Sequence, residues 1–336
     1  MTMYCQFFGL DKEPFGLTPD PAFLYLTPQH REALAGFTYG ILAQKGFVVL
    51  TGSAGTGKTT LLTRVMQHLP VARVRSSVIV NPTLTAAEFL EAVLLDFEFT
   101  DIPASKPQRI AALQRFLWDG QRAGKISALI VDEAHKLSLE VLEEIRLLGN
   151  FEAADQKLLQ IGLVGQSELD ELLDRDQLRQ FKQRIALRTA IGPLALNEVP
   201  HYVRHRWLKA GGAEPPFSPE AMAGIGQASE GVPRVVNVIC DNALILAFGE
   251  GSGSVEARHV LGACRDLRLA AEVPQTKTNA PAPRLADPAP PPAYPVPAVD
   301  GYQMKTLERY CSAGGNPSLW SRLAGKLGIQ QRGETA

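Results

Sequence analysis

The stretch "LTGSAGTGKTTLL", residues 50–62, directly follows a short apolar run at residues 47–50. It fills the phosphate-loop pattern Gly-x4-Gly-Lys-Thr, from Gly52 to Thr59. In such a loop, successive backbone N–H groups converge on phosphate oxygens, and the positive end of the following helix points at them. Glycine is needed because a Cβ would block this approach. The stretch therefore predicts a strand, a phosphate-binding loop and a helix in succession.

Each residue of this loop receives an expected role. Lys58 would pair with the β and γ phosphates of ATP, and the hydroxyl of Thr59 would coordinate Mg2+. The other residues expected to surround the phosphates are Gly52, Ser53, Ala54, Gly55, Thr56, Gly57 and Thr60. The loop thus predicts ATP and Mg2+ as cofactors.

Two carboxylates follow a second apolar run, at residues 128–131. The carboxyl end of a buried strand delivers its next residues to the ligand crevice of an α/β fold. We expect Asp132 to hold Mg2+, directly or through water, and Glu133 to orient or polarise the attacking water. Residues 132–135 also spell the Asp-Glu-Ala-His signature of a helicase class, but no other helicase motif follows. His135 would either touch the γ-phosphate or nearby sensing groups, or be purely structural.

The pattern between Phe47 and Ile191 decides the fold class. Short β-branched runs alternate there with amphipathic stretches, as in a parallel sheet covered by helices on both faces. The predicted strands are 47–51, 77–80, 128–131, 158–164 and 186–191. The predicted helices are 58–68, 86–97, 107–123, 139–151 and 168–183. The predicted fold is an α/β three-layer sandwich of the P-loop NTPase type, with a parallel five-stranded sheet.

Composition changes along the chain predict further parts. After Pro193 the strand signals stop, and the apolar spacing suits about four helices of a small all-α lid domain. Nine of the 24 prolines lie between Pro274 and Pro297, as in a solvated linker. The predicted parts are 1–45 (N-terminal strap and first helix), 46–194 (α/β domain), 195–271 (lid), 272–300 (linker) and 301–336 (tail).

The tail contains a short amphipathic pattern. Asn316 followed by Pro317 resembles a helix start, and Gly328 would close the helix. Its apolar residues fall on one side, and they are Leu319, Trp320, Leu323 and Leu327. The segment would dock on a protein partner, or it would be a frayed end or pack on its own body.

The overall charge disfavours a DNA partner without excluding a local basic patch, and the cysteine spacing shows no metal-ligand pattern. Thirty-four basic and 35 acidic side chains give a formal charge of −1, so no overall attraction to nucleic acid or anionic membrane is expected. The four cysteines are scattered without ligand spacing, as expected for reduced thiols. No export signal and no apolar run long enough to cross a bilayer is found. We expect a cytoplasmic protein that does not insert into membranes.

With these motifs located, the sequence resembles the AAA+ ATPases and, within them, the ExeA/GspA-like family of general secretion pathway ATPases. The resemblance runs over about residues 4–269. It rests on Phe7-Phe8-Gly9-Leu10, Pro14-Phe15, Thr18-Pro19-Asp20-Pro21, Tyr25-Leu26, His30-Arg31-Glu32-Ala33-Leu34, and on residues 46–52, 163–166, 179–185 and 231–234.

The resemblance implies roles for residues outside the two motifs. Gln166 matches the sensor 1 position, with Ser167 as its rival. Arg184 matches the arginine finger, which would act in trans on a neighbouring subunit and is worth roughly 10^3 to 10^5 in rate in other systems. Arg179 is the alternative finger, and either arginine would otherwise be an ordinary surface residue. Arg234 matches sensor 2, which would reach the phosphates of its own subunit from the lid.

Three functions fit these features. The first is an oligomeric ATPase that assembles or remodels a secretion or envelope complex, with the tail as the candidate site for a protein partner. The second is an ATP-dependent DNA-bound regulator like the transposition ATPases MuB and TnsC, which the near-neutral charge disfavours. The third is a nucleotide-controlled switch with little turnover, which an intact Glu133 disfavours. Longer secretion-type members continue into a transmembrane helix and a periplasmic domain, where this chain has the proline-rich linker and short tail.

Overall fold

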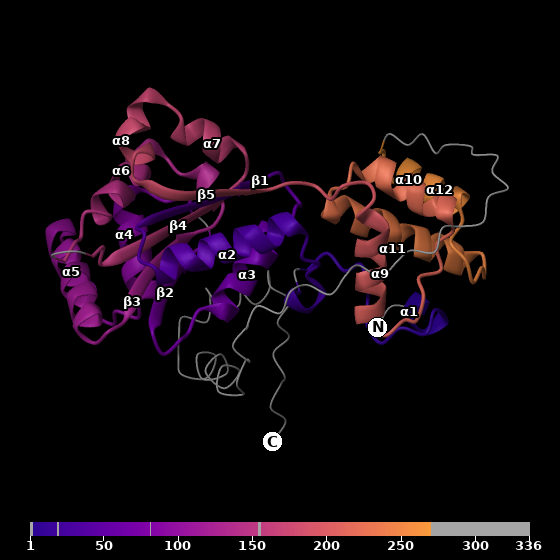
Figure 1. Ribbon diagram of the computed structural model, residues 1–336, viewed down its shortest axis with the longest axis horizontal. Helices are drawn as coiled ribbons and strands as arrows, with labels where there is room; N and C mark the ends of the chain where they lie inside the picture. The colour runs from indigo at the N-terminus through magenta and orange to yellow at the C-terminus, as the bar shows by residue number, and fades with distance from the viewer. Residues whose placement is uncertain (1–2, 19, 81, 154–155, 270–336) are drawn as a thin grey trace, which may run out of the picture. The chain divides into compact units, whose positions relative to one another are not determined.

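The computed structural model describes residues 3–18, 20–80, 82–153 and 156–269 (Figure 1). These residues divide into two compact units. One unit contains residues 20–192 and is built on a sheet, whereas the other contains residues 3–18 and 193–269 and is helical. The predicted linker 272–300 and tail 301–336, with its proposed docking helix, lie outside the described residues.

The sheet has five strands in the order β2-β3-β4-β1-β5, and all neighbouring strands are parallel. The strands are β1 (Phe47–Gly52), β2 (Val74–Ile79), β3 (Ile126–Val131), β4 (Leu159–Gly165) and β5 (Ile185–Ile191). Because the strands are parallel, their carboxyl ends all lie at the same edge of the sheet. The predicted parallel five-stranded sheet is confirmed.

Strand β2 begins at Val74, three residues before the predicted start at Ser77. Its first half contains Arg75 and Ser76, which do not resemble a buried strand. The strand tolerates these residues because β2 is an outermost strand of the sheet, where both side chains are only partly buried. A central position would have required the continuous apolar pattern of β1 or β3.

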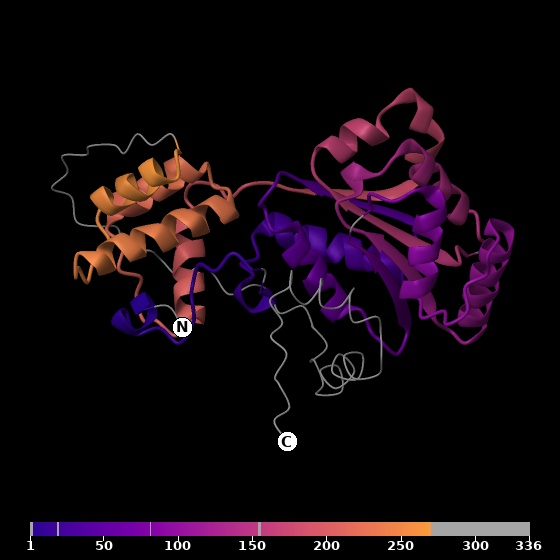
Figure 2. The ribbon, with the colours of Figure 1, turned by 180° about the vertical axis from the view of Figure 1, so that it is seen from behind.

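Helices cover both faces of the sheet, as the two opposite views show (Figures 1 and 2). The apolar residues form two separate cores: one includes residues of α2 and α3, and the other includes residues of α4, α5 and α6. The helices are α2 (Pro28–Leu42), α3 (Lys58–His68), α4 (Ala86–Asp96), α5 (Lys106–Arg122) and α6 (Leu139–Leu148). Short 3-10 helices occur at η1 (Pro21–Phe23) and η2 (Ala134–Lys136). The predicted three-layer α/β sandwich is therefore confirmed.

The helix predicted at 168–183 is wrong as a single helix. The chain forms α7 (Glu168–Leu173), a 3-10 turn η3 (Asp176–Leu178) and α8 (Arg179–Lys182). In one continuous helix, Leu178 and Phe181 would point away from the face that carries Leu169 and Leu173. All four of these side chains are buried, so the chain has to turn between α7 and α8.

The helical unit contains four main helices and the N-terminal segment. The main helices are α9 (Val199–Lys209), α10 (Pro219–Ser229), α11 (Pro233–Gly249) and α12 (Ala257–Asp266). Helix α1 (Met3–Phe7) packs here, and the hydroxyl of Tyr4 donates a hydrogen bond to the Asp241 carboxylate. The Nε of Arg206 donates to the Pro14 carbonyl. Residues 3–18 therefore belong to the helical unit, although they precede the sheet in the sequence.

Hydropathy of the helices also bears on membrane insertion. Within the part of the chain that the structure describes, no helix combines the length and apolar character needed to cross a bilayer.

Candidate nucleotide-binding site

The glycine-rich loop joins the end of β1 to the start of α3, at the carboxyl edge of the sheet. A Cβ on Gly52 would lie only 2.3 Å from the Ile191 carbonyl oxygen, so glycine here allows β5 to approach β1. Gly55 and Gly57 have φ angles of 78° and 97°, which favour glycine. The backbone conformation of the loop therefore favours glycine at positions 55 and 57, whereas close packing of β5 against β1 requires glycine at position 52.

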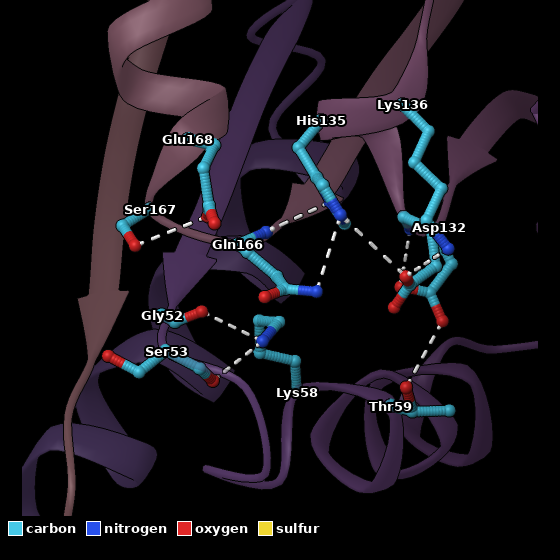
Figure 3. Close-up of polar contacts among 11 residues, drawn as sticks. Gly52, Ser53, Lys58, Thr59, Asp132, His135, Lys136, Gln166, Ser167 and Glu168 are labelled. Carbon is cyan, nitrogen blue, oxygen red and sulfur yellow. Dashed lines mark hydrogen bonds and ion pairs between the residues drawn. The ribbon is translucent and has the colours of Figure 1, made fainter.

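Lys58 begins α3 and folds back over the loop (Figure 3). Its ammonium donates to the carbonyl oxygens of Gly52 and Ser53, both at 2.8 Å. Burial lowers the pKa of Lys58, while the charges of Glu133 and Asp132 act in the opposite direction. The structure thus holds a nearly buried cation inside the loop, at a place where an anion would relieve its desolvation.

The other residues of the loop directly precede or follow Lys58 in the sequence. Thr56 is fully buried, and its hydroxyl donates to the Ser53 carbonyl at 2.8 Å. Ser53 and Ala54 are exposed at the tip of the loop, and Thr60 lies in the first turn of α3. The residues predicted to surround the phosphates therefore form one continuous loop between β1 and α3.

Thr59 and Asp132, the two predicted Mg2+ ligands, lie together although 73 residues separate them. The Thr59 hydroxyl donates to Asp132 Oδ2 at 3.2 Å, and the Glu133 N–H donates to Asp132 Oδ1 at 2.8 Å. Burial raises the pKa of Asp132, and the Glu133 N–H opposes this shift. Hydroxyl and carboxylate oxygens are ligands that suit Mg2+.

The donor set also limits which metal the site would suit. Among residues 3–18, 20–80, 82–153 and 156–269, no cluster of three or more His, Cys, Asp or Glu side chains is arranged to hold a metal. A single hydroxyl and carboxylate would leave most of an octahedral shell to water and phosphate oxygens, as Mg2+ sites beside nucleotides do. The residues present therefore fit Mg2+ and not a cage made of protein ligands alone.

Glu133 has left-handed backbone geometry, with a φ of 56°. Its carboxylate lies 3.0 Å from the Lys136 ammonium and 3.9 Å from His135 Nε2. Burial tends to raise the pKa of Glu133, but the hydrogen bond and charge of Lys136 lead to a net lowering. The side chain is therefore an ionised carboxylate that is ready to accept a proton or a hydrogen bond.

His135 connects this carboxylate to Gln166, the residue that follows β4 (Figure 3). The Gln166 N–H donates to His135 Nδ1 at 3.3 Å, so a neutral imidazole carries its proton on Nε2. The Gln166 amide nitrogen lies 3.3 Å from that Nε2. Two N–H donors do not pair, so the amide has to turn and present its oxygen to the ring. The NH2 group of Gln166 is then available to a ligand of the loop. The rival, Ser167, lies beside Glu168, and its hydroxyl is 3.4 Å from the Glu168 carboxylate.

The three predicted arginines are not part of this cluster. Arg184 precedes β5 at the amino edge of the sheet, and its Nη1 donates to the Arg146 carbonyl at 3.0 Å. Arg179 is exposed at the start of α8. Arg234 is exposed in the first turn of α11, in the helical unit. The sheet unit thus brings together Lys58 and the other motif residues without any of these arginines.

Two neighbours of the site had no role in the sequence analysis. Lys136 pairs with Glu133, and its i, i+3 spacing was a usable signal. His30, in α2, lies 3.1 Å from the carbonyl oxygen of Thr56 in the loop. Nothing in the spacing of the sequence indicates this second contact, because 26 residues separate the partners.

Comparisons with known proteins show which family the chain resembles. A family model described as an AAA domain matches residues 41–173. General secretion pathway protein A of Aeromonas hydrophila is 42% identical over 257 residues, which cover 75% of this chain and 46% of that protein. The chain belongs to the AAA+ family. The predicted resemblance to the ExeA/GspA-like proteins is confirmed, and this AAA+ chain spans about half the length of the curated relative that it matches.

Solved structures support the AAA+ fold independently. The Aeropyrum pernix ORC2 protein, in its ADPNP-ADP complexes, has a TM-score of 0.58 at 17% identity and covers 76% of this chain and 72% of its own. Drosophila ORC bound to DNA has a TM-score of 0.57 at 19% identity, with 77% and 67% covered. Cdc6p from Pyrobaculum aerophilum has a TM-score of 0.56 at 16% identity, with 73% and 70% covered. At these identities, the likeness shows the AAA+ fold.

Proposed function

We propose that this AAA+ chain binds Mg-ATP and hydrolyses it to ADP and phosphate. The observation that carries the proposal is the cluster in which Lys58, Thr59, Asp132 and Glu133 meet at one edge of the sheet. A buried ammonium in an amide-lined loop binds phosphates, and a nearby ionised carboxylate serves a water molecule. All four residues of this cluster lie in the sheet unit, residues 20–192.

Each residue would make a separate contribution. Lys58 would exchange a carbonyl partner for phosphate oxygens and neutralise their charge. Thr59 and Asp132 would hold Mg2+, which when bound spreads the negative charge of the phosphate oxygens. Glu133 would align the attacking water and accept its proton, and the amide NH2 of Gln166 would help to fix that water or the γ-phosphate.

The predicted arginines would reach the nucleotide from a second copy of the chain or from the helical lid. Arg184, or alternatively Arg179, would reach the site of a second copy and stabilise the charge that develops on the transferred phosphoryl group. Arg234 would contact the phosphates when the helical lid closes. The role of Arg184 or Arg179 would couple hydrolysis to assembly, so we propose that the chain functions as a homo-oligomer.

We further propose that turnover drives the assembly or remodelling of a secretion or envelope-associated complex from the cytoplasmic side. The support is the similarity to general secretion pathway protein A over three quarters of this chain. A protein partner of the tail would provide the connection. Purification of the Glu133→Gln protein from cells with ATP, followed by identification of co-purifying proteins, tests this step. Recovery of no secretion or envelope component would contradict it.

The Glu133→Gln change also tests the chemistry. The amide keeps the size of the side chain but loses its basicity, so we expect ATP affinity to stay within about threefold while hydrolysis falls about a hundredfold. Calorimetry with Mg-ATP measures binding, and a phosphate-release assay measures turnover. A Glu140→Gln variant, changed at an exposed position of α6, serves as the matched control. Turnover of the Glu133→Gln protein at the parental rate would refute the role of Glu133.

Titration of the ATPase rate with duplex DNA at two salt concentrations separates this proposal from a DNA-bound regulator. Binding through phosphate neutralisation must weaken steeply as salt rises. We expect no stimulation at either concentration. A salt-sensitive stimulation would favour the regulator.

A further inference from the structure

His30 is a nearly buried histidine beside the phosphate loop, with 3% of its surface exposed. Its Nε2 lies 3.1 Å from the Thr56 carbonyl oxygen, and its Nδ1 lies 2.7 Å from the Thr27 hydroxyl. The chemistry proposed above uses none of these groups. The contact to Thr56 nevertheless reaches the loop from a helix that comes earlier in the chain.

The partners of the ring determine where its proton lies. A carbonyl oxygen only accepts hydrogen bonds, so the His30 Nε2 must carry a proton and donate to Thr56. The Thr27 hydroxyl oxygen accepts from the His30 backbone N–H at 3.2 Å. The same hydroxyl keeps its own proton, with which it can donate to Nδ1 at 2.7 Å. These three contacts are satisfied by the neutral imidazole with its proton on Nε2.

The ring has little freedom to leave this position. Thr27 is the N-cap residue of α2 and is itself buried, so the capping bond and the ring contact share one hydroxyl. Further along α2, Ala33, Phe37 and Ile41 are buried in the core beneath the sheet. The donor on His30 is therefore held by a helix that is anchored independently of the loop.

The bond to Thr56 fixes the direction of a whole peptide group. The Thr56–Gly57 peptide is planar and trans, so its carbonyl oxygen and its N–H point in opposite directions. Because the carbonyl points at His30, the Gly57 N–H points away from α2. Gly57 has a φ of 97°, and glycine resists rotation of a neighbouring peptide less than any other residue. Without a partner for the carbonyl, this peptide would be free to turn.

We propose that His30 is a positioning residue whose Nε2–H···O=C bond to Thr56 locks the Thr56–Gly57 peptide so that the Gly57 N–H faces a phosphate of a bound nucleoside di- or triphosphate. The inference rests on the proposed function, because it assumes that the loop binds nucleotide. His30 touches neither the nucleotide nor the water. It acts through the loop, by removing the cost of ordering one N–H donor before the ligand arrives.

Two substitutions at this position separate donation from packing. His30→Gln keeps a side-chain N–H that can reach the Thr56 carbonyl, whereas His30→Phe keeps the ring volume and removes the donor. Calorimetry with Mg-ADP and Mg-ATP measures affinity, thermal unfolding without nucleotide measures stability, and steady-state assays separate KM from kcat. His201→Phe, on α9 of the helical unit, is the matched control.

We expect His30→Phe to weaken both nucleotides about tenfold, which is the effect of losing one buried hydrogen bond. KM for ATP should rise by a similar factor, with kcat at saturation within about threefold of the parental value. His30→Gln should restore affinity to within about threefold. The His201→Phe control should match the parental protein in every assay.

Three results would overturn the inference. Parental affinity in His30→Phe would show that the donor does not matter. Equal losses in both variants, together with a lower unfolding temperature, would assign His30 a purely structural role. Absence of nucleotide binding by the folded parental protein would instead remove the proposed function, and this inference with it.

Discussion

The two edges of the sheet differ in how complete they are. At the carboxyl edge, residues from β1, β3 and β4 meet within hydrogen-bond distance, and Lys58 and Asp132 already have partners inside the unit. At the amino edge, Arg184 donates a hydrogen bond to the backbone carbonyl of Arg146. A strand of six residues separates the two edges by about 20 Å.

This difference predicts which parts of the site would depend on the proposed assembly. The carboxyl edge forms because parallel strands end together, so a single chain suffices to build it. An arginine at the amino edge can serve a nucleotide only in another copy of the chain. Binding should therefore be a property of one subunit, whereas fast hydrolysis should require two.

The largest expected effect concerns binding at the carboxyl edge. Lys58→Ala removes the buried cation of the loop, so we expect Mg-ATP affinity to fall at least about a hundredfold. Calorimetry measures the loss. Lys125→Ala, just before β3 at the amino edge, is the matched control and should bind normally. Unchanged affinity of a folded Lys58→Ala protein would show that the carboxyl edge does not bind the nucleotide through Lys58.

The next effect tests the amino edge. Arg184→Ala should keep nucleotide affinity within about threefold but lower hydrolysis by at least about tenfold, because a finger acts only on the transition state. Arg179→Ala is the companion variant, and the larger loss identifies the finger. Unfolding temperatures control for the lost bond to the Arg146 carbonyl.

Mixing the two impaired proteins then shows whether the arginine acts between subunits. Arg184→Ala supplies an intact loop, and Lys58→Ala supplies an intact arginine. Their mixture should partly recover hydrolysis when the two chains co-assemble. No recovery in a demonstrated mixed oligomer would count against action in trans.

The smallest effect separates stability from chemistry at the carboxyl edge. Asp96 accepts a hydrogen bond from the Val78 N–H of β2, and burial raises its pKa to about 6 from 3.8. The folded protein therefore keeps this proton at a pH where the unfolded chain has released it. As pH rises from about 4 through about 6, the charged carboxylate lowers the free energy of unfolding.

Asp96→Asn should remove this cost while it keeps an acceptor for Val78. We expect the free energy of unfolding to rise by about 1 kcal/mol above about pH 7, with the gain vanishing below about pH 4. Urea unfolding at both pH values measures it, and nucleotide affinity should not change. An equal gain at both pH values would show that the charge is not responsible.

Much of the fold could be predicted from local patterns. Each of the five strands was expected within a few residues. The signal was strongest for β1, β3 and β4, which are buried along their whole length. Errors arose where tertiary position overrides the local pattern. The polar start of β2 is tolerated at an edge, and the helix expected at 168–183 breaks because Leu178 and Phe181 must also be buried.

The candidate site divides in the same way. The glycine loop and the acidic pair were visible because each motif is contiguous in the chain. Their meeting, through Thr59 and Asp132, required the order of the strands. The contact of His30 with Thr56 had no local signal at all.

The amino-acid sequence by itself determined the strand and helix types, the phosphate loop and the carboxylates that follow β3, because these depend on backbone preferences and side-chain periodicity over a few neighbouring residues. Only the tertiary structure decided that Asp132 faces Thr59, that His135 joins Gln166 to Glu133, and that His30 holds the loop. Such contacts form when packing brings distant segments within about 3 Å of each other. A local sequence pattern does not indicate which distant residues will meet.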